Sequence, residues 1–192
     1  MKYVAAISDA DILIHLARAD ELDILALLFE KIIVPQYVLE REIKRKAGNC
    51  LATILRYIEA GTLFEVVDRQ ADSTVNKLAL PVIEDKNVVV GRGESECAGY
   101  AAALGIDIII SNNSTEFKWL NENVMLTYYD ILALNVHFRH MDQVTANGKY
   151  EKINAILDQP SGRGFQQRQR ETFETIGEND WDIPLGLRKT NQ

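Results

Sequence analysis

Carboxylate and amide side chains recur in this sequence at places where a strand is expected to end or a helix to begin. They are Asp9 and Asp11, Glu40 and Glu42, Glu94 and Glu96, and the turn Ser111-Asn112-Asn113, with Glu116 nearby. Oxygen ligands of this kind are what Mg²⁺ and Mn²⁺ prefer in proteins. Such ions can activate water and stabilise its in-line attack on a phosphodiester. The recurrence therefore predicts a divalent-metal site assembled from distant parts of the chain.

Each acid also has a structural explanation when it is taken alone. Asp9 would cap the helix that follows it. Glu94, in the first turn of its helix, would complement the helix dipole. Glu40 and Glu42 would simply be solvated on an exposed helix. The ordered recurrence of the acids favours the metal site over these separate explanations.

Hydrophobic spacing predicts the elements that must position these side chains. Short apolar runs predict strands over residues 3–7, 32–34, 63–67, 107–110 and 124–126. Helical spacing is found over residues 11–18, 22–29, 35–46, 50–60, 94–104 and 128–137. Strands that are apolar on both faces and alternate with helices predict a three-layer α/β/α fold with a central parallel sheet. Ligand sites in such sheets lie at the carboxyl ends of the strands, which is where Asp9 and Asn113 fall.

The remaining segments are distinguished by their prolines and by their content of large apolar residues. Residues 72–87 are expected to form a helix broken at Pro81, and a short helix is expected around residues 117–120. We expect residues 1–140 to form one α/β domain and residues 141–192 to form a mostly helical or irregular extension. From Pro160 onward large apolar side chains are sparse, which predicts a tail without its own core that is dispensable for folding of residues 1–158.

Bulk composition limits the classes of function. The 192 residues carry a formal net charge of −7, which excludes a basic field over the whole surface and requires any RNA contact to be local. Cys50 and Cys97 have no metal-ligand or redox spacing, as expected for reduced thiols of a cytoplasmic protein. No apolar run approaches the roughly 20 residues of a membrane span, so no membrane partner is expected.

Two basic features could hold RNA phosphates near the acids. One is the run Lys44-Arg45-Lys46, and the other is Arg92, which lies between two glycines beside Glu94. The run is equally well explained as a solvated helix end whose cations suit the dipole.

Three stretches of the sequence resemble the PIN-domain superfamily. Residues Ile7 to Arg18, with Asp9 at a strand end, are similar to the opening of PIN domains. The continuation from Glu21 to Val38 is similar to a bacterial and archaeal branch of the superfamily. Gly93-Glu94-Ser95-Glu96, followed by small residues up to Ile110, resembles the most recognisable motif of that branch. The resemblance covers roughly residues 3–137.

This resemblance implies Mg²⁺- or Mn²⁺-dependent cleavage of RNA, often by toxins of the VapC type that pair with a small antitoxin. It also implies that the chain can form a homodimer. By position, Asp9 is the first metal ligand and Glu94 is the third acid. When the family pattern is aligned from Pro35 without a gap, the position of its second acid falls on Arg41. Arg41 is not an acid but is flanked by Glu40 and Glu42, so both of these remain candidates.

The fourth position departs from the family pattern. Ser111 is kept, but Asn113 replaces the usual aspartate, and Asn112 precedes it. An asparagine can offer a carbonyl oxygen to a metal ion but brings no charge, so metal affinity should fall. Two interpretations stay open. The chain is either an RNA endonuclease weakened by Asn113, supported by Asp11, Glu96, Ser111 and Asn112, or a catalytically inactive PIN-like domain that binds RNA or a protein partner.

Overall fold

A computed structural model describes residues 2–68, 73–113, 123–178, 181–182 and 187–188. Its centre is a five-stranded sheet with the order β3-β2-β1-β4-β5, in which every neighbouring pair is parallel. The strands are β1 (Tyr3–Ser8), β2 (Phe29–Pro35), β3 (Phe64–Val67), β4 (Ile108–Ile110) and β5 (Val124–Leu126). The predicted parallel sheet is confirmed. Strand β4 and the second half of β2 are buried and rich in Ile and Val, which suit the pleated surface of a covered sheet.

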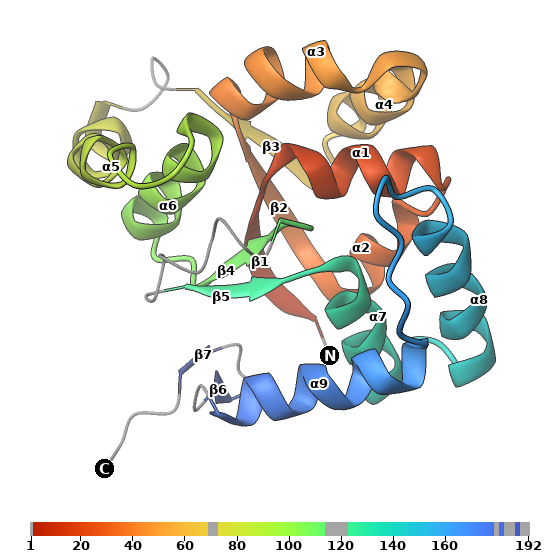
Figure 1. Cartoon of the computed structure of the whole chain (residues 1–192). Helices are drawn as coiled ribbons and strands as arrows, with labels where there is room; N and C mark the ends of the chain where they lie inside the picture. Colours follow the sequence, from red (N-terminus) through yellow and green to blue (C-terminus); the bar gives the residue numbers. More distant parts are fainter. Residues whose placement is uncertain (1, 69–72, 114–122, 179–180, 183–186, 189–192) are drawn as a thin grey trace.

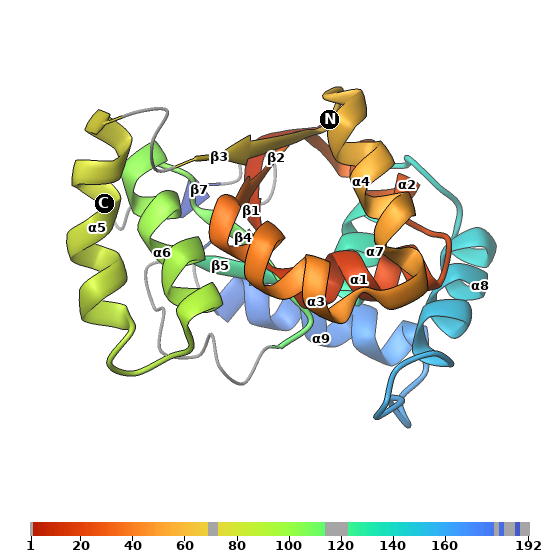
Figure 2. The same ribbon diagram turned by 90° about the horizontal axis from the view of Figure 1, so that it is seen from above.

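Helices cover both faces of this sheet and complete a three-layer fold (Figure 1). Helix α6 packs against β1, β2 and β4, with α5 outside it, while α2, α4 and α7 lie on the opposite side. Viewed from above, α5 and α6 stand apart from the group formed by α1, α3 and α4 (Figure 2). The helices are α1 (Ala10–Arg18), α2 (Asp23–Leu28), α3 (Lys44–Lys46), α4 (Leu51–Ala60), α5 (Ser73–Lys86), α6 (Arg92–Leu104), α7 (Tyr128–His137), α8 (Gln143–Asn154) and α9 (Phe165–Glu178).

Four smaller elements complete the secondary structure of the described residues. A π-helical segment, η1 (Val38–Ile43), runs directly into α3, and a 3₁₀ turn, η2 (Gly48–Cys50), leads into α4. Strands β6 (Trp181–Asp182) and β7 (Leu187–Arg188) form an antiparallel pair. The helix expected around residues 117–120, and Glu116 beside it, lie outside the described residues. No helix in the described part of the chain is long and apolar enough to cross a bilayer.

The expected break at Pro81 was wrong, because α5 continues through that residue. Proline removes one hydrogen bond within the helix and costs about 3 kcal/mol in a helix interior. Packing offsets this cost, because Ala79 and Ile83 are fully buried. A Cβ atom at Gly99 of α6 would lie 2.3 Å from Ile83 Cγ1, so the missing side chain of Gly99 is what lets α5 and α6 approach so closely.

The segment after residue 140 packs on the α/β layers. Lys149 and Lys152 of α8 both pair with the buried carboxylate of Glu21, which fixes α8 beside α1 and α2. Helix α9 packs on α7 and buries Phe165 and Ile176. This burial weighs against the expectation that residues 1–158 fold equally well without the tail.

A buried carboxylate joins α9 to the start of α7. Asp130 accepts hydrogen bonds from the backbone N–H and the hydroxyl of Thr127, at 2.9 and 2.6 Å, and closes a capping box at the N-terminus of α7. Its second oxygen accepts a 2.5 Å hydrogen bond from the Thr172 hydroxyl of α9. Burial raises the pKa of Asp130, and these hydrogen bonds partly oppose that rise.

Candidate active site

The carboxyl ends of β1 and β4 bring Asp9 and Ser111 together. The Asp9 backbone N–H donates to Ile110 O at 3.0 Å, which continues the strand pairing to the last residue of β4. Asp9 then begins α1, and its Oδ1 accepts from the Ala10 N–H at 2.7 Å. Its Oδ2 accepts from the Ser111 hydroxyl at 3.0 Å. Asp9 therefore caps α1 and also faces the turn after β4. Its role as a helix cap is compatible with a role in the candidate site.

The turn after β4 is tied to Asp11 by two hydrogen bonds. Asp11 Oδ1 lies 3.1 Å from the Ser111 hydroxyl and accepts from the Asn112 backbone N–H at 3.1 Å. The hydroxyl has one proton, so it donates to either Asp9 or Asp11 at a given moment. It also accepts from the Asn113 backbone N–H at 3.0 Å. Asn113 thus joins the cluster through its backbone, and the role of its half-buried side chain stays a prediction.

Asn112 has both ends of its amide engaged. Its Nδ2 lies 2.9 Å from His15 Nδ1, and its Oδ1 accepts from the Tyr128 backbone N–H at 3.1 Å. The amide donates, so His15 Nδ1 must accept, which requires a neutral imidazole protonated on Nε2. Burial lowers the pKa of His15, and this favours the neutral form. Asn112 therefore holds the turn against α1 and α7, a role that no spacing pattern in the sequence signals.

The π-helical segment η1 separates the two candidates for the second acid. Glu40 is exposed and pairs with Lys44 at 2.7 Å, whereas the side chain of Glu42 is only 17% exposed. A π turn closes i to i+5 bonds and adds one residue to the turn. The extra residue rotates the side chains that follow by about 100°, given 3.6 residues in an ordinary turn. An alignment without a gap takes no account of this extra residue, which is why it placed the second acid at Arg41.

Two glycines make room for Glu42 and Glu94. A Cβ atom at Gly93 would lie 2.0 Å from Glu42 Oε1, and a Cβ atom at Gly91 would lie 2.4 Å from Glu94 Oε2. The carboxylate of Glu42 thus rests on the first turn of α6, one residue before Glu94. The sequence predicts only a turn at residues 91–93. It does not indicate that the glycines of this turn leave space for the carboxylates of Glu42 and Glu94.

The charges of these acids act on Asp9, which is 3% exposed. Burial raises the pKa of Asp9 well above its ordinary value, and the charges of Asp11, Glu94 and Glu42 raise it further, against the lowering effect of the Ala10 N–H. Burial likewise raises the pKa of the Cys97 thiol, with Asp9 and Glu94 contributing. Asp9, Glu42 and Glu94 therefore share one electrostatic environment at the carboxyl edge of the sheet.

One ammonium group faces the same acids. Lys46 Nζ donates to Glu42 Oε2 at 3.0 Å. Desolvation lowers the pKa of Lys46, but the hydrogen bond to Glu42 and the charges of Glu42, Asp9 and Glu94 outweigh it and raise the pKa. Lys46 is thus the counter-ion of Glu42.

In the described part of the chain, no three His, Cys, Asp or Glu side chains gather closely enough to chelate a metal ion. The available donors still fit a hard divalent cation in kind, since they are carboxylate oxygens whose mutual repulsion a cation would relieve. Asp9 Oδ2 is held by Ser111 and Glu42 Oε2 by Lys46, so chelation requires a local rearrangement.

The other predicted site residues are placed around this cluster. Glu96 is fully buried and accepts from Arg92 Nε at 2.9 Å, which ties it to the helix rather than to Asp9. The guanidinium of Arg92 also lies over the Tyr37 ring, 5.8 Å from its centroid. Lys44 is paired with Glu40, and Arg45 is exposed. Contacts of Arg92, Lys44, Arg45 and Lys46 with RNA stay predictions.

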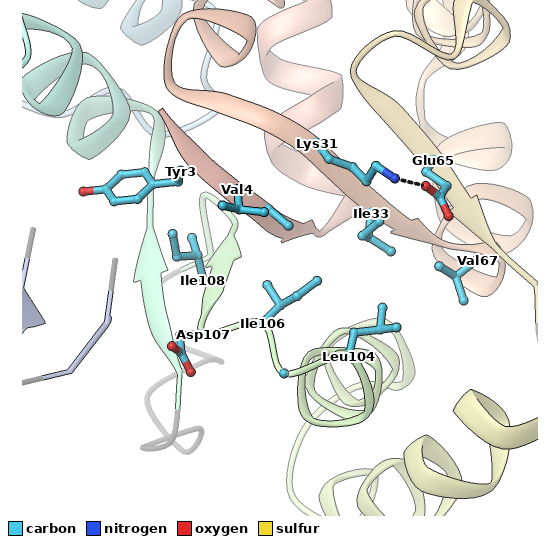
Figure 3. Close-up of a pocket in the computed structure, with 12 residues that line it drawn as sticks. Tyr3, Val4, Lys31, Ile33, Glu65, Val67, Leu104, Ile106, Asp107 and Ile108 are labelled. Atoms are coloured by element: carbon cyan, nitrogen blue, oxygen red, sulfur yellow. Dashed lines mark hydrogen bonds and ion pairs between the residues drawn. The ribbon is translucent and has the colours of Figure 1, made fainter. Parts of the chain in front are cut away.

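A separate groove of about 580 Å³ lies elsewhere, between β1–β3 and the C-terminal end of α6 (Figure 3). Val4, Ile33, Val67, Leu104 and Ile106 line it, and the Lys31–Glu65 ion pair lies along one side. None of the acids of the candidate site lines this groove. The groove and the acidic edge are therefore separate features of the surface.

Comparison with known proteins agrees with this geometry. A family model for the PIN domain matches residues 5–118, a segment that runs from β1 to the residues just after the turn following β4 and holds Asp9, Glu42, Glu94 and Asn113. No curated protein matches the chain. Because the matched segment is more than half of the chain and contains strands β2, β3 and β4 with most of β1, the chain belongs to the PIN-domain family.

Proposed function

We propose that this chain is a metal-dependent RNA endonuclease in which Asp9, Glu42, Glu94 and the side-chain oxygen of Asn113 hold Mg²⁺ or Mn²⁺. The PIN domain is a nuclease-type fold that generally uses divalent metals and typically binds nucleic acids. The observation that carries the proposal for this chain is the gathering of negative charge at one edge of the sheet, where Asp9 and Asp11 share the Ser111 hydroxyl and the Glu42 carboxylate rests on the first turn of α6 beside Glu94. A divalent cation would neutralise that excess charge.

A bound ion would polarise the phosphate and lower the pKa of a coordinated water. The residues of the chain position the acids for it. The Ser111 hydroxyl orients the carboxylates of Asp9 and Asp11, and Asn112 fixes the turn that carries Ser111. Such supporting hydrogen bonds commonly set the affinity of a metal site, because they fix the orientation of its ligands.

Recognition of RNA is proposed for the basic residues at the rim of the cluster. Lys44, Arg45 and Lys46 follow Glu42 on the same continuous helix, and Arg92 begins α6 two residues before Glu94. A net charge of −7 leaves phosphate contacts to such local groups. An antitoxin-like protein partner and a homodimer remain proposals supported by the resemblance to VapC-type toxins.

A catalytically inactive PIN domain that binds RNA or a protein is the second candidate. Two observations favour it. Asn113 brings no charge, and Lys46 already neutralises Glu42 at 3.0 Å. Both reduce the negative charge that attracts a divalent ion.

Calorimetric titration of Mn²⁺, paired with cleavage of single-stranded RNA, tests the proposal. We expect Asp9→Asn, Glu42→Gln and Glu94→Gln each to weaken Mn²⁺ binding by about tenfold or more, since one step of ten corresponds to roughly 1.4 kcal/mol. Glu40→Gln is the matched control and should bind as the parent does. Cleavage abolished by Asp9→Asn supports the endonuclease, whereas Mn²⁺ binding without any cleavage supports the binding module. Equal effects of Glu40→Gln and Glu42→Gln would contradict the assignment of the second acid.

A further inference from the structure

Lys46 and Lys44 form two similar ion pairs with very different surroundings. Both lysines lie in α3 and pair with the glutamate four residues earlier, Lys44 with Glu40 and Lys46 with Glu42. The Lys44–Glu40 pair is exposed on both sides, at 41% and 44%. In the other pair, Lys46 is 64% exposed but Glu42 is only 17% exposed. Lys46 thus reaches from solvent onto a carboxylate that faces the interior of the site.

The ammonium of Lys46 interacts with more than its hydrogen-bond partner. The negative charges of Asp9 and Glu94 act on it together with that of Glu42. Lys46 therefore contacts Glu42 directly and lies close enough to Asp9 and Glu94 for their charges to act on it. The Glu42 carboxylate lies against Gly93 in the first turn of α6, so Lys46 meets it on the side that faces solvent.

We propose that Lys46 is a tethered counter-ion that competes with the divalent metal for Glu42. This inference rests on the proposed metal site and deepens it. With Glu42 engaged by a metal ion, the Lys46 ammonium would be released to solvent at the rim of the site, where it could contact an RNA phosphate. Metal binding and phosphate binding are therefore coupled through one side chain.

The strength of the Lys46–Glu42 ion pair determines how much Lys46 weakens metal binding. Solvent screens exposed ion pairs strongly and partly buried pairs less, so the Lys46–Glu42 pair should be the stronger of the two. Removing the ammonium should therefore tighten Mn²⁺ binding by about three- to tenfold. Arginine in the same place keeps the charge and should keep the parent affinity.

The experiment is calorimetric titration of Mn²⁺ into the full chain and into Lys46→Met, Lys46→Arg and Lys44→Met. Lys44→Met is the matched control, because it removes the same charge from the same helix without touching Glu42. Tighter binding only in Lys46→Met supports the inference. If Asp9→Asn abolishes Mn²⁺ binding but all three lysine variants bind as the parent does, the inference is overturned and the metal site stands. If neither the parent nor Lys46→Met binds Mn²⁺, the metal site itself is overturned together with the inference.

Discussion

The resemblance places Asn113 where PIN domains usually carry an aspartate, and the Asn113 backbone N–H donates to the Ser111 hydroxyl at 3.0 Å. We expect Asn113→Asp to raise Mn²⁺ affinity by about tenfold, which corresponds to roughly 1.4 kcal/mol. The reason is that the variant adds one formal negative charge to a partly desolvated cluster. Titration of both proteins checks the expectation, and equal affinities would show that this side chain does not reach the metal site.

Asp9 should be a destabilising residue in the metal-free protein. Its folded-state pKa is raised, so the folded chain carries a penalty at neutral pH that disappears as pH falls through that pKa. Asparagine is an equally good helix cap and has no charge. We expect Asp9→Asn to raise the Tm at pH 7.5 by about 2–4 °C, the shift that 1 kcal/mol produces in a chain of this size.

The pH dependence supplies the control for this variant. The difference in Tm between Asp9→Asn and the parent should shrink as the pH is lowered into the acid range, because Asp9 itself becomes neutral there. A difference that grows on acidification would mean that Asp9 is stabilised as a carboxylate, which is contrary to the proposed repulsion.

How much of the site could be predicted depends on how each residue is positioned. Asp9 and Glu94 could be located because they directly follow a strand or begin a helix. Glu42 could not be separated from Glu40, since the choice depends on the π turn in η1, which hydrophobic spacing does not show. The pairing of Lys46 with Glu42 has the i, i+4 spacing of an ordinary helix, so this ion pair could have been predicted from the sequence.

At the scale of elements, the contact between η1 and α6 depends on a glycine. Alanine at Gly93 would place its Cβ 2.0 Å from Glu42 Oε1, and the flexible carboxylate would yield. We expect Gly93→Ala to weaken Mn²⁺ binding by about fivefold, or roughly 1 kcal/mol, while stability hardly changes.

Gly148 provides the contrasting variant. It lies inside α8, and a Cβ atom there meets nothing within 4 Å. Gly148→Ala should stabilise the chain by about 0.5–1 kcal/mol through helix propensity and leave Mn²⁺ binding unchanged. Equal metal affinity in Gly93→Ala and Gly148→Ala would argue against close packing of Glu42 on α6.

The contact between α9 and α7 depends on the Thr172 hydroxyl. Thr172→Val removes its hydrogen bond to the buried Asp130 and should cost about 1.5–3 kcal/mol, as expected for a hydrogen bond to a charged group. Thr172→Ser retains the hydroxyl and should cost less. Urea unfolding of both variants measures the difference, and identical midpoints would show that the hydroxyl does not hold α9.

The elements that the sequence predicted well are those whose signals are local. The buried strands, and α4 and α6, which end at glycines with φ of 63° and 64°, lie close to where they were expected. Helix α5 continues through Pro81 because it packs against α6. This packing cannot be predicted from the residues around Pro81. The C-terminal extension was expected to be mostly helical or irregular, but the bounds of α9 could not be predicted, because its buried face contains Thr172 between Phe165 and Ile176 and its apolar residues are few.

At the scale of the whole molecule, charge is distributed unevenly. The chain is acidic overall, with a net charge of −7, yet Lys44, Arg45 and Lys46 follow one another on the helix beside the acidic edge. An anionic substrate would be repelled by most of the surface and attracted locally at that helix. This arrangement suits a protein whose contact with nucleic acid is confined to one site.

The position of β1 at the centre of the sheet has a consequence for the kinetics of folding. The first strand of the chain must pair with β4, which joins Ile7 to Ile109, and this pairing places the turn after β4 beside Asp9. Contacts between residues so far apart in sequence form slowly, and we expect this one to form late. An ion bound by the finished site would then slow unfolding and leave the refolding rate unchanged. At a Mn²⁺ concentration about a hundred times the Kd, unfolding should slow by roughly a hundredfold, so stopped-flow measurements in both directions would reveal when the acidic edge is assembled.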